Sequence, residues 1–133
     1  MARILLVEDF AEIRRLIAAL LTSHGHTVVG EVDRGDEVLA AVRASEPEVV
    51  LLDISLPRRN GLDVLVDLCA AAPAVVSIML SSHDDPYYIN EARRRGAVDF
   101  VVKNDAPERL IRAIADGLAT QDDGAPGTGV GSP

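Results

Sequence analysis

The chain has 133 residues, the size of one domain, and it is 48% hydrophobic and 26% charged, which is too apolar for a disordered polypeptide. Its net charge of −8 repels the phosphates of nucleic acids, so this chain alone binds nucleic acids poorly. A single cysteine excludes an internal disulfide, and no apolar run suits a signal peptide or a membrane span, so we expect a cytoplasmic protein that does not enter membranes.

Five apolar runs of strand character alternate with five helical patterns along the chain. The predicted strands are residues 3–7, 27–32, 49–53, 75–80 and 98–102. The helix after the first strand repeats apolar residues every three or four positions and ends near Gly25. Its predicted inward face is Ile13, Leu16, Ile17, Leu20 and Leu21. The helix after the third strand is predicted to turn inward Leu62, Leu65, Val66 and Cys69.

Strict alternation of strands and helices predicts a parallel α/β sheet with right-handed crossovers and helices on both faces. For five strands the common doubly wound order is 2-1-3-4-5, a flavodoxin-like, three-layer α/β/α arrangement. We expect this domain to occupy residues 1–119. Residues 120–133 are rich in Gly and Pro, show no periodicity, and are expected to form a flexible tail or the start of a linker.

Asp53 directly follows four apolar residues that read as a strand buried on both faces. In the predicted order, Glu8 and Asp9, Ser81 and Lys103 follow neighbouring strands and lie at the same edge of the sheet. Clustered carboxylates repel one another and require a cation, and hard oxygen ligands suit Mg²⁺. An aspartate nucleophile with a metal, a hydroxyl and an amine matches the needs of phosphoryl transfer.

These motifs resemble the receiver domains of two-component response regulators, over residues 2 to about 119. The matching segments are Leu5-Leu6-Val7-Glu8-Asp9, Val50-Leu51-Leu52-Asp53-Ile54-Ser55-Leu56-Pro57, Asn60-Gly61-Leu62, Met79-Leu80-Ser81-Ser82 and Gly96-Ala97-Val98-Asp99-Phe100-Val101-Val102-Lys103. Their order and spacing jointly make the resemblance specific.

The resemblance implies that Asp53 takes a phosphoryl group from the phosphohistidine of a sensor histidine kinase. Glu8, Asp9, Asp53 and the backbone carbonyl of Ser55 would hold Mg²⁺. Ser81 would bind a phosphoryl oxygen and Lys103 would pair with the phosphate. Phe100 would change rotamer when Ser81 moves, which would switch the partner-binding face. The domain would then be a phosphoryl acceptor with self-catalysed phosphotransfer and dephosphorylation rather than a turnover enzyme.

Departures from the family pattern leave alternatives open. Asn104 stands where many members have proline, and Lys103-Asn104 resembles receivers of the LuxR type, which act on DNA through a C-terminal domain that is absent from this sequence. Receivers of the family also pair with one another. A pseudo-receiver that binds partners without being phosphorylated is the main alternative. A haloacid-dehalogenase-type hydrolase needs a second aspartate where Ser55 stands, and a flavodoxin needs a phosphate loop where Glu8 and Asp9 would repel phosphate.

Overall fold

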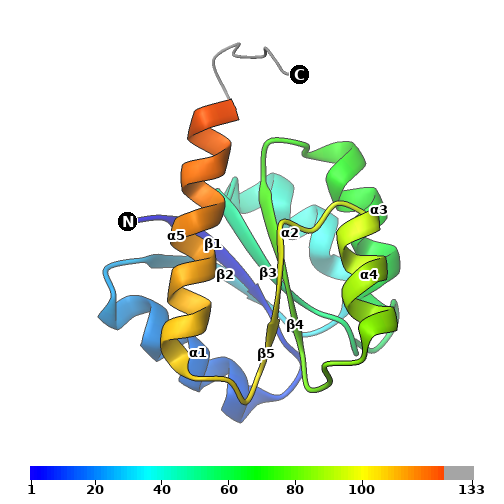
Figure 1. Cartoon of the computed structure of the whole chain (residues 1–133), viewed down its shortest axis with the longest axis horizontal. Coiled ribbons are helices and arrows are strands. Elements are labelled where there is room, and N and C mark those ends of the chain that lie inside the picture. The colour runs from blue at the N-terminus through cyan, green and yellow to red at the C-terminus, as the bar shows by residue number, and fades with distance from the viewer. Residues whose placement is uncertain (125–133) are drawn as a thin grey trace.

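The structure is a computed structural model that describes residues 1–124 (Figure 1). The strands are β1 Arg3–Val7, β2 Thr27–Val32, β3 Val49–Asp53, β4 Val76–Ser81 and β5 Asp99–Val102. The helices are α1 Ala11–Ser23, the 3₁₀ turn η1 Gly35–Glu37, α2 Val38–Ser45, α3 Gly61–Ala71, α4 Pro86–Arg94 and α5 Pro107–Gly124. The expected strand–helix alternation is confirmed, with β4 and β5 each beginning one residue later than predicted.

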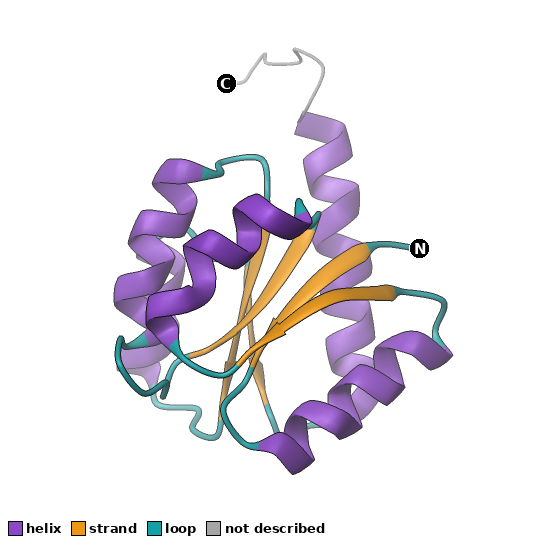
Figure 2. Ribbon diagram, turned by 180° about the vertical axis from the view of Figure 1, so that it is seen from behind, coloured by secondary structure: helices purple, strands orange, loops and turns teal. Residues whose placement is uncertain are grey.

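The five strands form one parallel sheet in the order β2-β1-β3-β4-β5, as expected (Figure 2). The order places β1 and β3 side by side at the centre, with Val7 opposite Leu52. Asp53 in turn lies opposite Leu80 of β4. The carboxyl ends of three neighbouring strands therefore meet at one edge of the sheet.

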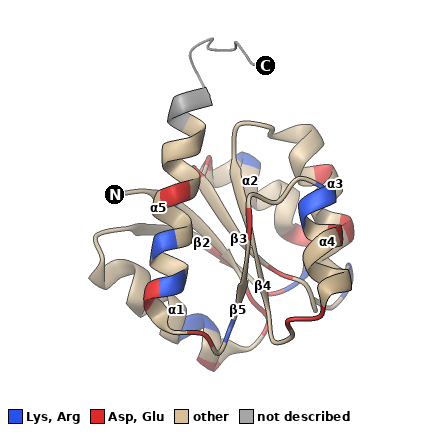
Figure 3. Ribbon diagram, in the orientation of Figure 1, with Lys and Arg blue, Asp and Glu red and all other residues tan. Residues whose placement is uncertain are grey.

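Each face of the sheet is covered by its own apolar cluster, so the domain has three layers. On one face α2, α3 and α4 pack through a cluster that includes Val38, Leu65 and Ala92. On the other face α1 and α5 pack through a cluster that includes Leu21 and Ile114. The two groups of helices lie on opposite sides of the sheet in Figure 1. Figure 3 shows that charged residues lie mainly on the helices and loops, while most of each strand is uncharged.

Two predicted core positions are exposed. Leu16 is 71% exposed, because the apolar stripe of α1 is wider than its contact with the sheet. Leu16 instead borders a cavity of about 420 Å³ between α1 and the start of α5. Val66 is 47% exposed, because α3 turns Val64 and Leu68 toward the sheet together with the predicted Leu65.

The last helix extends further than its sequence pattern indicates. α5 continues to Gly124 and so includes the first residues of the expected tail. The remainder of that tail, residues 125–133, lies outside the described residues. Within residues 1–124, no helix is both long enough and apolar enough to cross a bilayer.

Candidate functional site

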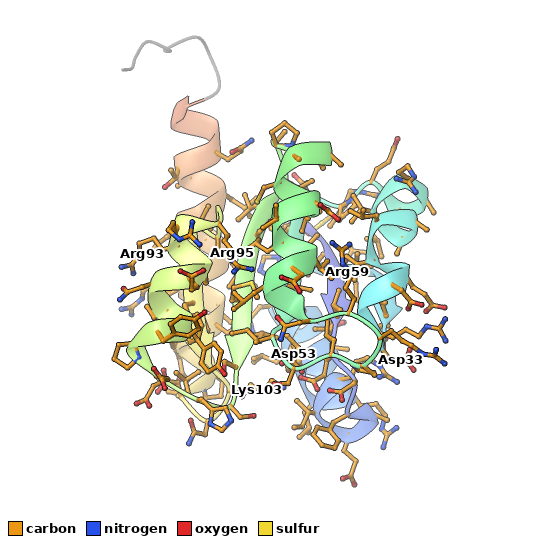
Figure 4. The ribbon with its side chains drawn as sticks, turned by 90° about the vertical axis from the view of Figure 1, so that its right-hand side faces the viewer. Asp33, Asp53, Arg59, Arg93, Arg95 and Lys103 are labelled. Atoms are coloured by element: carbon orange, nitrogen blue, oxygen red, sulfur yellow. The ribbon has the colours of Figure 1, made fainter. Side chains whose placement is uncertain are left out.

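Asp53 is the last residue of β3 and is only 2% exposed. The four preceding residues are all fully buried, so the strand carries the carboxylate to the edge of the core without bringing it into open solvent. Figure 4 shows Asp53 and Lys103 close together at the lower end of the sheet, away from Arg93 of α4 and from Arg95, which directly follows that helix. Burial of an ionised carboxylate is costly unless charges or hydrogen bonds compensate it.

Three residues from three parts of the chain form a contiguous charged cluster. The Lys103 ammonium Nζ lies 3.0 Å from Asp53 Oδ2 and 2.6 Å from Glu8 Oε1. The other Asp53 oxygen, Oδ1, accepts a hydrogen bond of 3.1 Å from the Ser55 backbone N–H. Glu8 is fully buried, and its Oε2 accepts a hydrogen bond of 3.0 Å from the Phe10 backbone N–H. Lys103 is the only lysine of the chain, so one amine serves two carboxylates.

Glu8, Asp9 and Asp53 also meet the geometric requirement for a metal site. One carboxylate oxygen from each lies within 4.8 Å of the other two. Apart from the contact with Lys103, the buried Glu8 Oε1 has no hydrogen-bond partner among the described residues. Mg²⁺ prefers carboxylate oxygens and keeps several waters, which suits a cluster whose third member, Asp9, is half-buried. The residues present therefore fit the expected Mg²⁺.

The cluster also shifts the protonation of its members. Burial raises the pKa of Asp53 to about 6; the hydrogen bond and charge of Lys103 oppose this rise, and the charge of Glu8 adds to it. Burial alone would lower the pKa of Lys103, but the two carboxylates outweigh it and raise that pKa. Lys103 is therefore protonated at neutral pH, whereas keeping the buried Asp53 carboxylate ionised costs free energy.

The remaining predicted residues lie on the same edge or on the adjoining strand. Ser81 ends β4, is buried, and accepts a hydrogen bond of 3.0 Å at Oγ from the His83 backbone N–H. Its carbonyl accepts a hydrogen bond of 2.7 Å from the Lys103 backbone N–H, which links the ends of β4 and β5. Phe100 is half-buried on β5, opposite Met79, and packs against the cluster beneath α2, α3 and α4.

Two residues at this edge carry roles that the sequence analysis did not assign. Gly61 lies against the end of β3, since a Cβ atom added to it would fall 2.1 Å from the Asp53 carbonyl oxygen. Arg14 lies in the first turn of α1, and its side chain is only 20% exposed and reaches the end of β1. No motif or periodicity in the sequence indicates this contact, because the group that accepts from Arg14 is a backbone carbonyl.

Comparisons with known proteins agree with this geometry. The family model described as "Response regulator receiver domain" matches residues 4–115, and the chain belongs to that family. The chemotaxis protein CheY of Thermotoga maritima is 31% identical over 112 residues, which cover 84% of this chain and 93% of that protein. The transcriptional regulatory protein PdtaR of Mycobacterium tuberculosis is 34% identical over 114 residues, covering 84% of this chain but 54% of that protein.

Solved structures give the same result. The crystal structure of a LuxR-family two-component response regulator from Aurantimonas sp. superposes with a TM-score of 0.86 at 27% identity. The match covers 90% of this chain and 86% of that chain. The domain is therefore a response regulator receiver with the acidic triad typical of a receiver phosphorylation site.

Proposed function

We propose that Asp53 accepts a phosphoryl group from the phosphohistidine of a sensor histidine kinase, with Mg²⁺ held by the acidic triad. The observation that carries this proposal is the charge imbalance of the buried cluster, in which Glu8 and Asp53 share the single ammonium of Lys103. At an effective dielectric constant of about 20, two like charges about 4 Å apart repel by ~4 kcal/mol, so a cation at this position is favourable.

The reaction is a displacement at phosphorus. One Asp53 carboxylate oxygen forms a bond to phosphorus, the P–N bond to the kinase histidine breaks, and the electron pair of that bond stays on the imidazole. When bound, Mg²⁺ neutralises charge on the phosphoryl oxygens. Glu8, Asp9, Asp53 and the Ser55 carbonyl would hold it, while the Ser55 N–H orients the carboxylate through Oδ1.

Lys103 and Ser81 act on the product. The Lys103 ammonium lies 3.0 Å from Asp53 Oδ2 and can pair with a phosphate attached to that carboxylate. The Ser81 hydroxyl, which accepts from the His83 N–H, retains its own proton to donate to a phosphoryl oxygen. Movement of Ser81 toward the phosphate would then favour a new Phe100 rotamer and change the surface near β5. Hydrolysis of the acyl phosphate by water returns the domain to its resting state, so it works as a two-state switch with self-catalysed phosphotransfer and dephosphorylation.

The output of the switch is a further proposal. Several relatives are transcriptional regulators of which this chain covers about half the length, such as PdtaR at 54%. An output on DNA would therefore need a further domain, because the receiver itself carries a net charge of −8. Pairing of two phosphorylated receivers is the alternative output. A cytoplasmic location agrees with the kinase partner and with the single cysteine.

Phosphate incorporation from acetyl phosphate tests the proposal. We expect a covalent adduct that requires Mg²⁺, survives acid, is lost in base, and is absent in Asp53→Asn. Asp33→Asn is the matched control, because Asp33 is an exposed aspartate and its loss should leave the adduct unchanged. An adduct that persists in Asp53→Asn would overturn the assignment. No adduct together with no Mg²⁺ binding would instead indicate a pseudo-receiver that acts only through protein contacts.

A further inference from the structure

Arg14 joins the first turn of α1 to the carboxyl ends of β1 and β2. Its Nη1 donates a hydrogen bond of 2.8 Å to the Glu8 carbonyl oxygen, and its Nε lies 3.0 Å from Glu31 Oε1. Its own backbone N–H donates 2.9 Å to the Phe10 carbonyl. Arg14 therefore contacts the segment that carries Glu8 and Asp9 through both its backbone and its side chain.

The hydrogen bond from Arg14 restrains the peptide group that leads from Glu8 into Asp9. The direction of this peptide group determines where the Asp9 backbone and side chain begin. On the other side, the Glu8 N–H donates 3.0 Å to the Val32 carbonyl of β2. With these two bonds, the backbone of Glu8 is held at both its donor and its acceptor.

Asp9 depends on this backbone restraint more than its neighbours do. Glu8 and Asp53 each have hydrogen bonds or an ion pair that orient their carboxylates. Within residues 1–121, no side-chain hydrogen bond or ion pair holds the Asp9 carboxylate, although it lies within the acidic triad. Its position therefore follows from the peptide group that Arg14 restrains.

We infer that Arg14 is a positioning residue for the Mg²⁺ site: it orients the Glu8–Asp9 peptide and so places the Asp9 carboxylate. This inference rests on the proposed function, since it assumes that Mg²⁺ binds the triad. Arginine suits the role because its planar guanidinium can donate to two acceptors in fixed directions, here a carbonyl just after β1 and a carboxylate on β2. Groups that orient metal ligands from outside the site commonly change metal affinity about 10- to 100-fold when they are removed.

Charge alone predicts the opposite result. Removal of a positive side chain near a divalent cation site reduces repulsion and should strengthen Mg²⁺ binding. Loss of positioning should weaken it. The sign of the change in Mg²⁺ affinity therefore separates a positioning role from a purely electrostatic one.

The chain offers a matched control on the same helix. Arg15 follows Arg14, is exposed, and carries the same charge. We would titrate the wild type, Arg14→Gln, Arg15→Gln and Arg14→Lys with Mg²⁺ alone and follow backbone amide resonances around Asp9 and Asp53 by NMR. The spectrum without Mg²⁺ reports whether each variant is folded.

We expect Arg14→Gln to raise the Mg²⁺ dissociation constant about tenfold. Arg15→Gln should leave it unchanged or lower it slightly. Arg14→Lys keeps the positive charge, but its ammonium can reach only one of the two acceptors. We therefore expect a smaller increase in the dissociation constant than for Arg14→Gln. If Arg14→Gln does not fold, the comparison of Arg14→Lys with wild type decides the question, because unaltered Mg²⁺ affinity there would overturn the inference.

The outcomes also separate this inference from the proposed function. Wild-type protein that binds no Mg²⁺ contradicts the proposed function itself. Wild-type protein that binds Mg²⁺, with Arg14→Gln equal to or tighter than Arg15→Gln, contradicts the positioning role alone.

Discussion

Polar groups are paired differently at the two ends of the sheet. At the amino ends of the strands, the Ala2 N–H donates 3.0 Å to His26 Nδ1 and the Arg3 N–H donates 2.9 Å to Glu48 Oε1. Of these two acceptors, His26 is half-buried and Glu48 is exposed. At the carboxyl ends, Glu8 and Asp53 are buried around one ammonium. At the amino ends, these two N–H groups are paired within the protein. At the carboxyl ends, the buried carboxylates carry more negative charge than the single ammonium neutralises, and a ligand can neutralise the excess.

The largest effect should follow removal of the shared cation. Lys103→Ala leaves two buried carboxylates without their ammonium, and the loss of one partner from a buried ion pair costs about 3–5 kcal/mol. We therefore expect a decrease of that size in the free energy of unfolding at pH 7, measured by urea denaturation without divalent cations. Saturating Mg²⁺ should recover part of the loss, because it supplies positive charge to the same carboxylates.

An exposed ion pair provides the control for this prediction. Arg94 contacts Glu91 on α4 with its side chain 67% exposed, so Arg94→Ala should change stability little. A Lys103→Ala variant as stable as Arg94→Ala would show that the buried cluster is compensated in some other way.

A smaller effect of opposite sign should follow neutralisation of Asp53. Its pKa is raised from 3.8 to about 6 in the folded chain, so its contribution to stability is present below pH 4 and is lost as the pH rises through 6. A shift of this size corresponds to about 3 kcal/mol at pH 7. We expect Asp53→Asn to increase the free energy of unfolding at pH 7 without Mg²⁺, by up to that amount.

The pH dependence provides the check. The stability difference between Asp53→Asn and wild type should grow between pH 4 and pH 7, as followed by thermal or urea unfolding. A difference that is constant over this range would contradict the raised pKa.

The smallest effect is expected at the amino end. Burial lowers the pKa of His26, with a further contribution from the charges of the N-terminus and His24. Because the folded value lies below the ordinary 6.5, the neutral ring stabilises the fold above pH 6.5 and this contribution is lost as the pH falls through the folded value. Protonation removes the acceptor of the Ala2 N–H. Wild type should lose stability between pH 7 and pH 5 relative to His26→Gln, whereas His24→Gln should show a slightly smaller loss than wild type, because it removes one of the charges that lower the His26 pKa.

The sequence was sufficient for the fold and for identifying charged residues that meet at the carboxyl ends of the strands. Apolar runs that end in Asp53 and Lys103, separated by helical patterns, imply one sheet order and hence one charged edge. The structure confirms that order and brings Glu8, Asp53 and Lys103 into contact. Periodicity was weaker evidence for helix faces, as Leu16 and Val66 show. The stripe of a helix that contacts the sheet is narrower than the stripe of apolar residues in its sequence.

The role of Arg14 could not be obtained from sequence patterns. Its partners are a backbone carbonyl six residues before it and a carboxylate 17 residues after it. Any residue can supply a backbone carbonyl, and Glu31 lies on another strand. Neither partner can therefore be recognised from the periodicity of α1. Such contacts depend on the three-dimensional approach of the helix to the strand ends.

The most direct test of the central claim compares the stability of wild type and Asp53→Asn as Mg²⁺ is added at pH 7. Without Mg²⁺ the variant should be the more stable protein. With Mg²⁺ at about 100 times its dissociation constant, wild type should gain about 2.7 kcal/mol while the variant gains much less, so that the two curves converge or cross. Parallel curves, with wild type unaffected by Mg²⁺, would contradict the claim that the buried carboxylates at this edge form a cation-dependent phosphoryl-acceptor site.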